Sequence, residues 1–111
     1  MAARGSAALK TRASLFAALG DETRLSVLAK LSDGAPQSIA RLTDGTHVSR
    51  QAVTKHLRVL ENAGVVRSLR AGRETRFEIV PKSIDQARDW LDDISRQWDD
   101  ALARLKSFVE D

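Results

Sequence analysis

Polar and cationic side chains are concentrated on one side of the segment 49–63, which has the pattern of an amphipathic helix: Ser49, Arg50, Gln51, Thr54, Lys55 and Arg58. A glutamine can form two hydrogen bonds with the edge of an adenine, and an arginine or a lysine can bind a guanine. The first turns of such a helix are the part that reaches base edges in a major groove. We therefore expect these side chains to contact DNA rather than to form an ordinary solvated face. Which of them contact bases and which contact phosphates stays open.

A second cationic cluster follows at Arg70, Arg73 and Arg76. It surrounds Gly72, where the missing side chain allows another backbone to approach closely. Arginines at the tip of a hairpin suit contact with phosphates or with a minor groove. The alternative is a merely solvated hairpin, and we favour contact with DNA.

The helix that carries the first cluster has clear ends and a clear buried side. Ser49 can accept a hydrogen bond from an unpaired amide one turn into the helix, and Gly64 suits the left-handed residue that closes a helix. Val65 and Val66 follow at once, so a strand is expected directly after the helix. The buried side is defined by apolar residues at helical spacing: Val53, Leu57 and Leu60.

The second cluster lies between two expected strands, over residues 65–69 and 75–80. In the later strand Phe77 and Ile79 point to one face and Arg76 to the other, because side chains alternate along a strand. An isolated hairpin is only marginally stable in water. We therefore expect this hairpin to pack against the helices.

Three further helices are expected upstream, over residues 9–19, 21–31 and 38–43, with Asp21 as the N-cap of the second. The third of them, the turn 43–48 and the helix 49–63 match a helix-turn-helix. Residues 1–8 are small and polar and are expected to be disordered. The side chains that we expect the second and third helices to bury are Leu25, Leu28, Leu31, Ile39, Ala40 and Leu42.

The last segment predicts a long helix, over residues 83–110, with a heptad repeat of apolar side chains. The seam consists of Ile84, Ala87, Leu91, Ile94, Trp98, Ala101, Leu105 and Phe108. So long a stripe exceeds what a small domain can cover alone, so the expected partner is the last or the first helix of a second copy. The side chains expected at this dimer interface are Leu15, Phe16, Leu91, Ile94, Trp98, Leu102, Leu105 and Phe108.

The charges are distributed unevenly, although the net charge is only +3. Residues 41–76 hold eight basic and three acidic side chains, whereas residues 77–111 hold five basic and nine acidic ones. The cationic middle therefore indicates a polyanionic partner. The chain has no cysteine, no signal-peptide core and no apolar run that approaches the ~18 residues of a membrane span. We expect a cytoplasmic protein that does not bind membranes.

No arrangement of residues predicts catalysis, a cofactor or a metal site. No nucleophile has a base at a suitable spacing, so we do not expect an enzyme. His47 and His56 do not have the spacing of metal ligands. His56 is expected to pack or to form hydrogen bonds, and contact with the DNA backbone is the alternative. The acidic residues of the last helix are interpreted as a solvated face and not as a divalent-ion site: Asp92, Asp93, Asp99 and Asp100.

These residues together resemble the ArsR family of bacterial winged-helix repressors over nearly the whole chain. The matching segments are residues 19–25, residues 49–60, the Ala-Gly-Val-Val of residues 63–66, and Gly72-Arg73 with Phe77. The resemblance implies a mainly helical winged helix-turn-helix fold with a small β-hairpin, and a dimer on the terminal helices that binds operator DNA. Many relatives sense metals through cysteines or through histidine on the last helix, which this chain lacks. It resembles the metal-independent branch, whose effector is unknown.

The resulting hypothesis is a single winged-helix domain over residues 1–111 that acts as a homodimeric repressor on double-stranded DNA. Two-fold symmetry predicts a palindromic operator with half-sites about 34 Å apart, or a multiple of that distance. An effector would act on the geometry of the two subunits. The main alternative is a winged-helix module that binds protein and not DNA.

Overall fold

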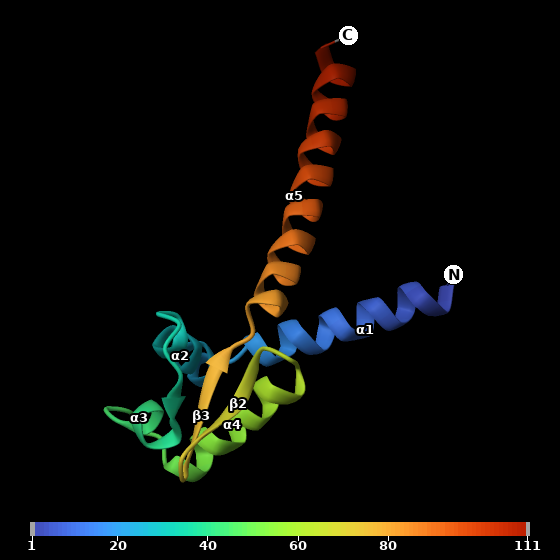
Figure 1. Cartoon of the computed structure of the whole chain (residues 1–111). Coiled ribbons are helices and arrows are strands. Elements are labelled where there is room, and N and C mark those ends of the chain that lie inside the picture. The colour runs from blue at the N-terminus through green and yellow to red at the C-terminus, as the bar shows by residue number, and fades with distance from the viewer. Residues whose placement is uncertain (1, 111) are drawn as a thin grey trace.

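The computed structural model describes residues 2–110, with side chains from residue 8 onward (Figure 1). In this part the chain forms α1 (Ala2–Leu19), α2 (Glu22–Leu31), β1 (Gln37–Ser38), α3 (Ile39–Thr43), α4 (Arg50–Asn62), β2 (Val66–Ala71), β3 (Glu74–Ile79) and α5 (Pro81–Glu110). The order of elements confirms the expected winged helix-turn-helix, mainly helical with a small β-hairpin.

Side-chain caps determine where the middle helices begin. Asp21, Ser38 and Ser49 each accept a hydrogen bond from the backbone amide three residues later, at 3.0, 3.2 and 3.1 Å. Each cap satisfies an amide that has no partner inside the helix. At the other end of α4, Gly64 has a φ of 78°, and the amide of Val65 donates to the carbonyl of Leu60 at 2.9 Å. This left-handed closure turns the chain from α4 into β2.

The sheet has three strands in the order β1-β3-β2, and both pairings are antiparallel. β2 and β3 form the expected hairpin, with Gly72 at a φ of 65° in its turn. β1 is a strand that the sequence did not predict, because two residues carry no alternation pattern. β1 forms only because it pairs with β3, which places Gln37 opposite Phe77 and Ser38 opposite Arg76.

The core lies between α4, the other helices and the inner face of the hairpin. The expected buried residues Val53, Leu57 and Leu60 are at most 1% exposed, and Phe77 is 6% exposed. The rest of this core is made by apolar side chains from every other helix and from the start of the hairpin: Leu15, Ala18, Val27, Leu28, Leu31, Leu42, Val65, Val66 and Ala87.

Two burial predictions are wrong. Leu25 is 53% exposed, because α2 packs through the side that carries Val27, Leu28 and Leu31. At about 100° per residue, Leu25 lies outside that arc. Ala40 is also exposed, since the single turn of α3 buries Leu42 and partly buries Ile39.

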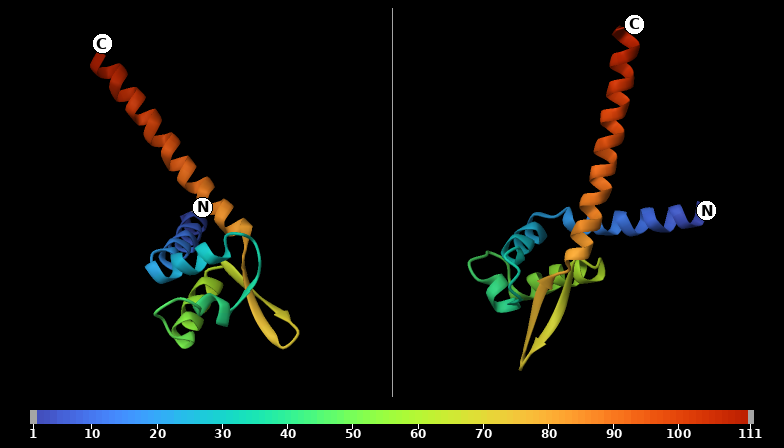
Figure 2. Two further views of the ribbon diagram at one scale, coloured as in Figure 1. Left: turned by 90° about the vertical axis from the view of Figure 1, so that its left-hand side faces the viewer. Right: turned by 45° about the horizontal axis from the view of Figure 1, so that its top comes forward.

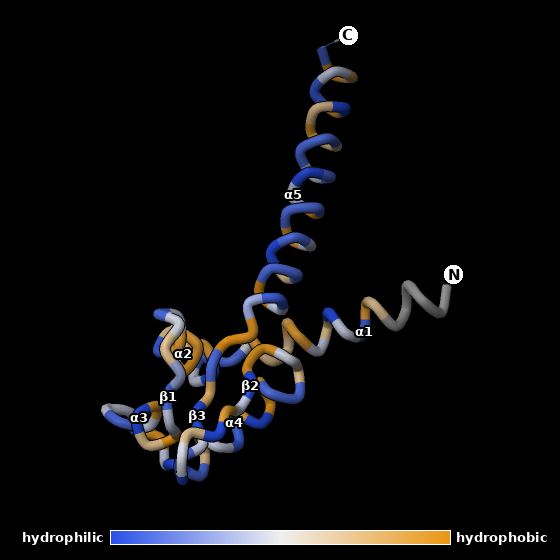
Figure 3. Tube along the Cα trace, in the orientation of Figure 1, coloured by the Kyte–Doolittle hydropathy of each residue, from blue (hydrophilic) through white to orange (hydrophobic). Residues whose placement is uncertain are grey.

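α5 leaves the rest of the molecule as a long projection, and the extents of the chain are 67 × 34 × 21 Å (Figures 1 and 2). Its first turns bury Ser83 and Ala87, whereas every residue from Leu91 to Glu110 except Ala101 is exposed. Apolar positions recur between hydrophilic ones along this helix (Figure 3). Among the described helices, none has the length and apolar character needed to span a membrane.

The N-terminal helix begins earlier than expected, at Ala2 instead of Leu9. The predicted disorder over residues 1–8 stays a prediction, because Met1 and the side chains of residues 2–7 lie outside the described part of the chain.

Candidate nucleic-acid interface

The outer face of α4 carries most of the first predicted cluster in open positions. Ser49, Arg50, Gln51, Lys55 and Arg58 are exposed, on the side opposite the buried Val53, Leu57 and Leu60. Thr54 is half-buried, and its hydroxyl donates to the carbonyl of Arg50 at 2.8 Å. The hydroxyl oxygen of Ser49 accepts the cap hydrogen bond, which leaves its proton available to an acceptor outside the helix.

The charges on this face differ in how far they are neutralised. Nη1 of Arg58 lies 3.9 Å from a carboxylate oxygen of Glu61. Among the ion pairs between described residues, none involves Arg50 or Lys55. The beginning of α4 therefore presents two unneutralised cations beside the amide of Gln51.

The wing, formed by β2, β3 and their turn, presents the second cluster. Arg70 and Arg73 are exposed, and no ion pair in the described part of the chain includes either of them. Arg76 differs from both, since its Nε donates to Oε2 of Glu74 at 2.8 Å. The hydrogen bond from Arg76 is the largest cause of the lowered pKa of Glu74. Sequence patterns alone did not distinguish Arg76 from the two free arginines.

The wing is attached to α4 by a contact that the sequence did not indicate. The hydroxyl of Ser68 in β2 donates to Oε2 of Glu61 in α4 at 2.9 Å. At the base of the wing, Nε of Arg67 donates to Oε1 of Glu78 across the two strands at 2.6 Å. The first contact joins the wing to α4, and the second joins the two strands of the wing to each other.

A polar network holds α4 against α1 and the start of α2. Nη1 of Arg24 lies 3.2 Å from Nδ1 of His56, and Oδ2 of Asp21 lies 3.7 Å from the same nitrogen. Arg24 also donates to the backbone carbonyls of Ala18 at 2.6 Å and Ala17 at 3.3 Å. The expected hydrogen-bonding role of His56 is confirmed. Its partners on α1 and α2 were not predicted.

Lys30 fixes the turn that precedes α4. Its Nζ donates to the carbonyls of Leu42 at 3.0 Å and Asp44 at 3.1 Å. A cation at the end of α3 satisfies carbonyls that have no helical partner. The relative position of α3 and α4 is thereby held by a residue of α2.

The residues predicted for a dimer interface fall into two groups. On α5 they are exposed by 43% to 81% of their surface: Leu91, Ile94, Trp98, Leu102, Leu105 and Phe108. On α1, Phe16 is half-buried, with its ring centroid 5.4 Å from that of Trp90. Leu15 is 7% exposed and belongs to the core of the single chain. It therefore offers almost no surface to a second copy.

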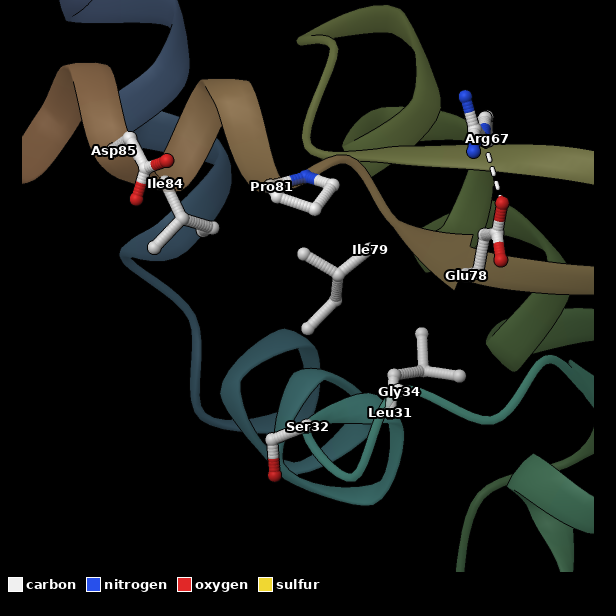
Figure 4. Close-up of a pocket in the computed structure, with 9 residues that line it drawn as sticks. All are labelled: Leu31, Ser32, Gly34, Arg67, Glu78, Ile79, Pro81, Ile84 and Asp85. Atoms are coloured by element: carbon white, nitrogen blue, oxygen red, sulfur yellow. Dashed lines mark hydrogen bonds and ion pairs between the residues drawn. The ribbon is translucent and has the colours of Figure 1, made fainter.

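A hollow of about 440 Å³ lies where α2, β3 and α5 meet (Figure 4). Leu31, Ile79 and Pro81 border it, with the Arg67–Glu78 pair at one edge and Asp85 at another. Its lining combines apolar side chains with ion-paired ones. No group of three His, Asp or Glu side chains in the described part of the chain could hold a metal ion.

Comparison with known proteins places this geometry among DNA-binding regulators. Residues 19–68, from the end of α1 into β2, match a family model described as a helix-turn-helix domain. The chain is 38% identical to an ArsR-like transcriptional regulator from Rhodococcus sp. RHA1, with a TM-score of 0.82 over 92% of this chain and 95% of that one.

Two curated relatives come from Mycobacterium tuberculosis. The chain is 31% identical to the HTH-type transcriptional regulator Rv2034 over 84% of its own length and 83% of the relative's. It is 30% identical to the HTH-type transcriptional repressor SmtB over 79% of its own length and 63% of the relative's.

Proposed function

This chain belongs to the ArsR family of winged helix-turn-helix transcriptional regulators and binds DNA to regulate transcription, and from that premise we propose that it is a homodimeric repressor of a palindromic operator. Each subunit inserts the beginning of α4 into a major groove, and its wing holds the flanking backbone. The word repressor in the name of one relative supports repression as the outcome. DNA held in this way is unavailable to RNA polymerase.

The observation that carries the proposal is the exposure of polar side chains on one side of α4. Gln51 and Lys55 are exposed one turn apart on a helix whose opposite side is buried. Arg24 and His56 hold the same helix from behind. A donor and acceptor set on a rigid helix can distinguish base pairs, because each pair has its own pattern in the major groove.

The free arginines of the wing support a second, sequence-independent contact. Arg70 and Arg73 lie at the hairpin turn, where Gly72 leaves room for a backbone to approach. Contacts of this kind fix the register of a protein on DNA without reading bases. The mechanism therefore separates recognition by α4 from attachment by the wing.

The homodimer is supported by the apolar surface of α5. Five large apolar side chains of the heptad seam, and Leu102 beside it, are exposed between Leu91 and Phe108 in the single chain. A patch of this size on one protein marks an interaction surface. A two-fold dimer would present two α4 helices to half-sites about 34 Å apart or a multiple of that distance. In the bacteria that hold the similar regulators, DNA lies in the cytoplasm, and we propose that this chain acts there.

Fluorescence anisotropy tests the proposal with two labelled duplexes, one from the promoter of the chain's own gene and one of random sequence. We expect Gln51→Ala and Lys55→Ala to weaken promoter binding by at least about fivefold, since a good base contact contributes about 1–3 kcal/mol. Asn62→Ala, on an exposed residue at the far end of α4, is the matched control and should bind as the wild type does. Equal losses in all three variants would contradict the assignment.

A winged-helix module that binds only protein is the alternative function. It predicts no salt-dependent binding to either duplex, because the phosphate contacts of a DNA-binding protein release counterions. Binding to the promoter with a steep salt slope, together with weaker binding to the random duplex, excludes this alternative.

A further inference from the structure

Arg76 and Glu74 lie on the outward face of β3, two residues apart, and form an ion pair near the wing tip. Nε of Arg76 is 2.8 Å from Oε2 of Glu74, and the two side chains are 46% and 47% exposed. Both remain within reach of a ligand from solution. The pair differs from the wing arginines Arg70 and Arg73, which have no acidic partner within the described residues.

A second cation, Arg41 of α3, lines the same hollow as this carboxylate. The charge of Arg41 contributes to the lowered pKa of Glu74, after the larger effects of Arg76 and a hydrogen bond from Ser38. Pairing of β1 with β3, which sets Ser38 opposite Arg76, brings α3 beside the wing. A hollow of about 240 Å³ there is lined by all four residues and by Asp33.

We propose that Arg41 and Arg76 form a binding site for a DNA backbone phosphate, and that Glu74 occupies this site in the free protein as an internal substitute for the phosphate. The inference rests on the proposed DNA-binding function and adds a third point of attachment between α4 and the wing tip. When DNA binds, the guanidinium of Arg76 exchanges a carboxylate for a phosphate oxygen.

Chemistry and position both support the exchange. Carboxylates and phosphates present the same kind of anionic oxygen to an arginine, and both bind its planar fork. α3, the wing tip and the start of α4 lie at the end of the molecule opposite the C-terminus (Figures 1 and 2). A phosphate at this site would therefore belong to the same duplex that α4 reads.

The carboxylate of Glu74 opposes the binding of a phosphate at this site. With Glu74 and Asp33 present, the charges of Arg41 and Arg76 are balanced by two negative charges. A phosphate must displace Glu74 and then remain close to it. Glu74 therefore weakens the sequence-independent part of DNA binding and leaves the base contacts of α4 unchanged.

Binding to a random-sequence duplex over a series of salt concentrations tests this role without knowledge of the operator. Glu74→Gln is expected to bind roughly fivefold more tightly at low salt and to steepen the slope of log K against log salt, because the phosphate no longer shares the charge of Arg76 with a carboxylate. Glu74→Gln/Arg76→Gln and Glu74→Gln/Arg41→Gln should lose most of this gain.

Asp85→Asn is the matched control, because it removes the same charge from another exposed ion pair. Asp85 lies 3.1 Å from Arg88 on α5, away from the wing tip. It should leave the slope as in the wild type. Equal gains from Glu74→Gln and Asp85→Asn would overturn the inference, as would a gain that persists in the double variants. Thermal unfolding of each variant confirms that it is folded.

These results also separate the inference from the proposed function. If the wild type binds duplexes with a salt slope but Glu74→Gln matches Asp85→Asn, only the phosphate site fails. If the wild type binds no duplex at low salt, the proposed function fails. The predicted pattern, in which the gain requires Arg41 and Arg76, supports both.

Discussion

Nη1 of Arg24 lies 3.2 Å from Nδ1 of His56, and this contact joins the first turn of α2 to the middle of α4. A guanidinium can only donate a hydrogen bond, so Arg24 is the donor in this contact. The same arginine donates to the carbonyls of Ala17 and Ala18 near the end of α1. One side chain thus connects three helices behind the candidate DNA-reading surface.

Replacing Arg24 by alanine should therefore destabilise the chain and weaken operator binding together. We expect the free energy of unfolding to fall by about 1.5–3 kcal/mol, the range for lost hydrogen bonds that involve a charged group. Urea denaturation measures the loss. Arg88→Ala, which removes an exposed ion pair with Asp85, should cost less than about 0.5 kcal/mol. Equal costs in the two variants would contradict the role of Arg24.

Acid should remove the contribution of Asp21 to stability. The pKa of Asp21 lies below its ordinary value of 3.8, chiefly because its carboxylate accepts the backbone amide of Arg24, and further because of the charges of Arg24 and His56. The unfolded chain therefore binds this proton at a higher pH than the folded chain does. The stabilisation is present above pH 3.8 and is lost as the pH falls through the lower folded value. Thermal unfolding of Asp21→Asn should depend less on pH in this acid range than that of the wild type, and identical pH dependence would refute the assignment.

Replacing Gly64 should destabilise the chain by the free energy that a residue with a side chain needs to adopt a left-handed backbone conformation. Its φ is 78°, and an added Cβ would meet no atom within 4 Å. The backbone conformation alone, without any steric clash, therefore determines the loss of stability. We expect Gly64→Ala to lower the free energy of unfolding by about 1–2 kcal/mol and Gly64→Asn to lower it less, because asparagine adopts this conformation more readily. Chemical denaturation measures the order of stability of the wild type and the two variants. A Gly64→Ala variant more stable than Gly64→Asn would contradict the prediction.

A charge on the exposed stripe of α5 should separate the proposed dimer. Trp98 is 64% exposed in the single chain. Burial of one large apolar side chain contributes about 1.5–3 kcal/mol. A two-fold dimer loses two of them, so Trp98→Asp should raise the dimer dissociation constant at least about 100-fold. Sedimentation velocity measures the change, and Asp99→Ala, beside the seam, should remain dimeric. A Trp98→Asp chain that sediments as the wild type does would exclude this stripe as the interface.

Most of the helical framework could be predicted because its signals are local. Ser49 and Asp21 cap the helices that were expected to begin after them. The spacing of Val53, Leu57 and Leu60 identified the buried side of α4. An N-cap acts within one turn and a heptad within a few, so neither requires knowledge of the rest of the chain.

The errors and omissions concern contacts between distant segments. Leu25 has a helical spacing from Leu28 and Leu31 but lies outside the arc that α2 packs against the core. β1 is too short to have a pattern and forms only because the edge of β3 accepts it. Arg76 and Arg73 are equivalent in the sequence, yet only Arg76 lies on the same strand face as Glu74 and within its reach.

The amino-acid sequence by itself therefore determined where most of the helices lie, which side of α4 is buried and which side is cationic. Only the tertiary structure decided which cations are free, which partners hold α4 in place and which apolar side chains stay uncovered. The physical reason is the separation along the chain over which each interaction acts. Periodicity and capping act between neighbours along the chain, whereas ion pairing and burial depend on residues that folding brings together, such as Arg24 with His56.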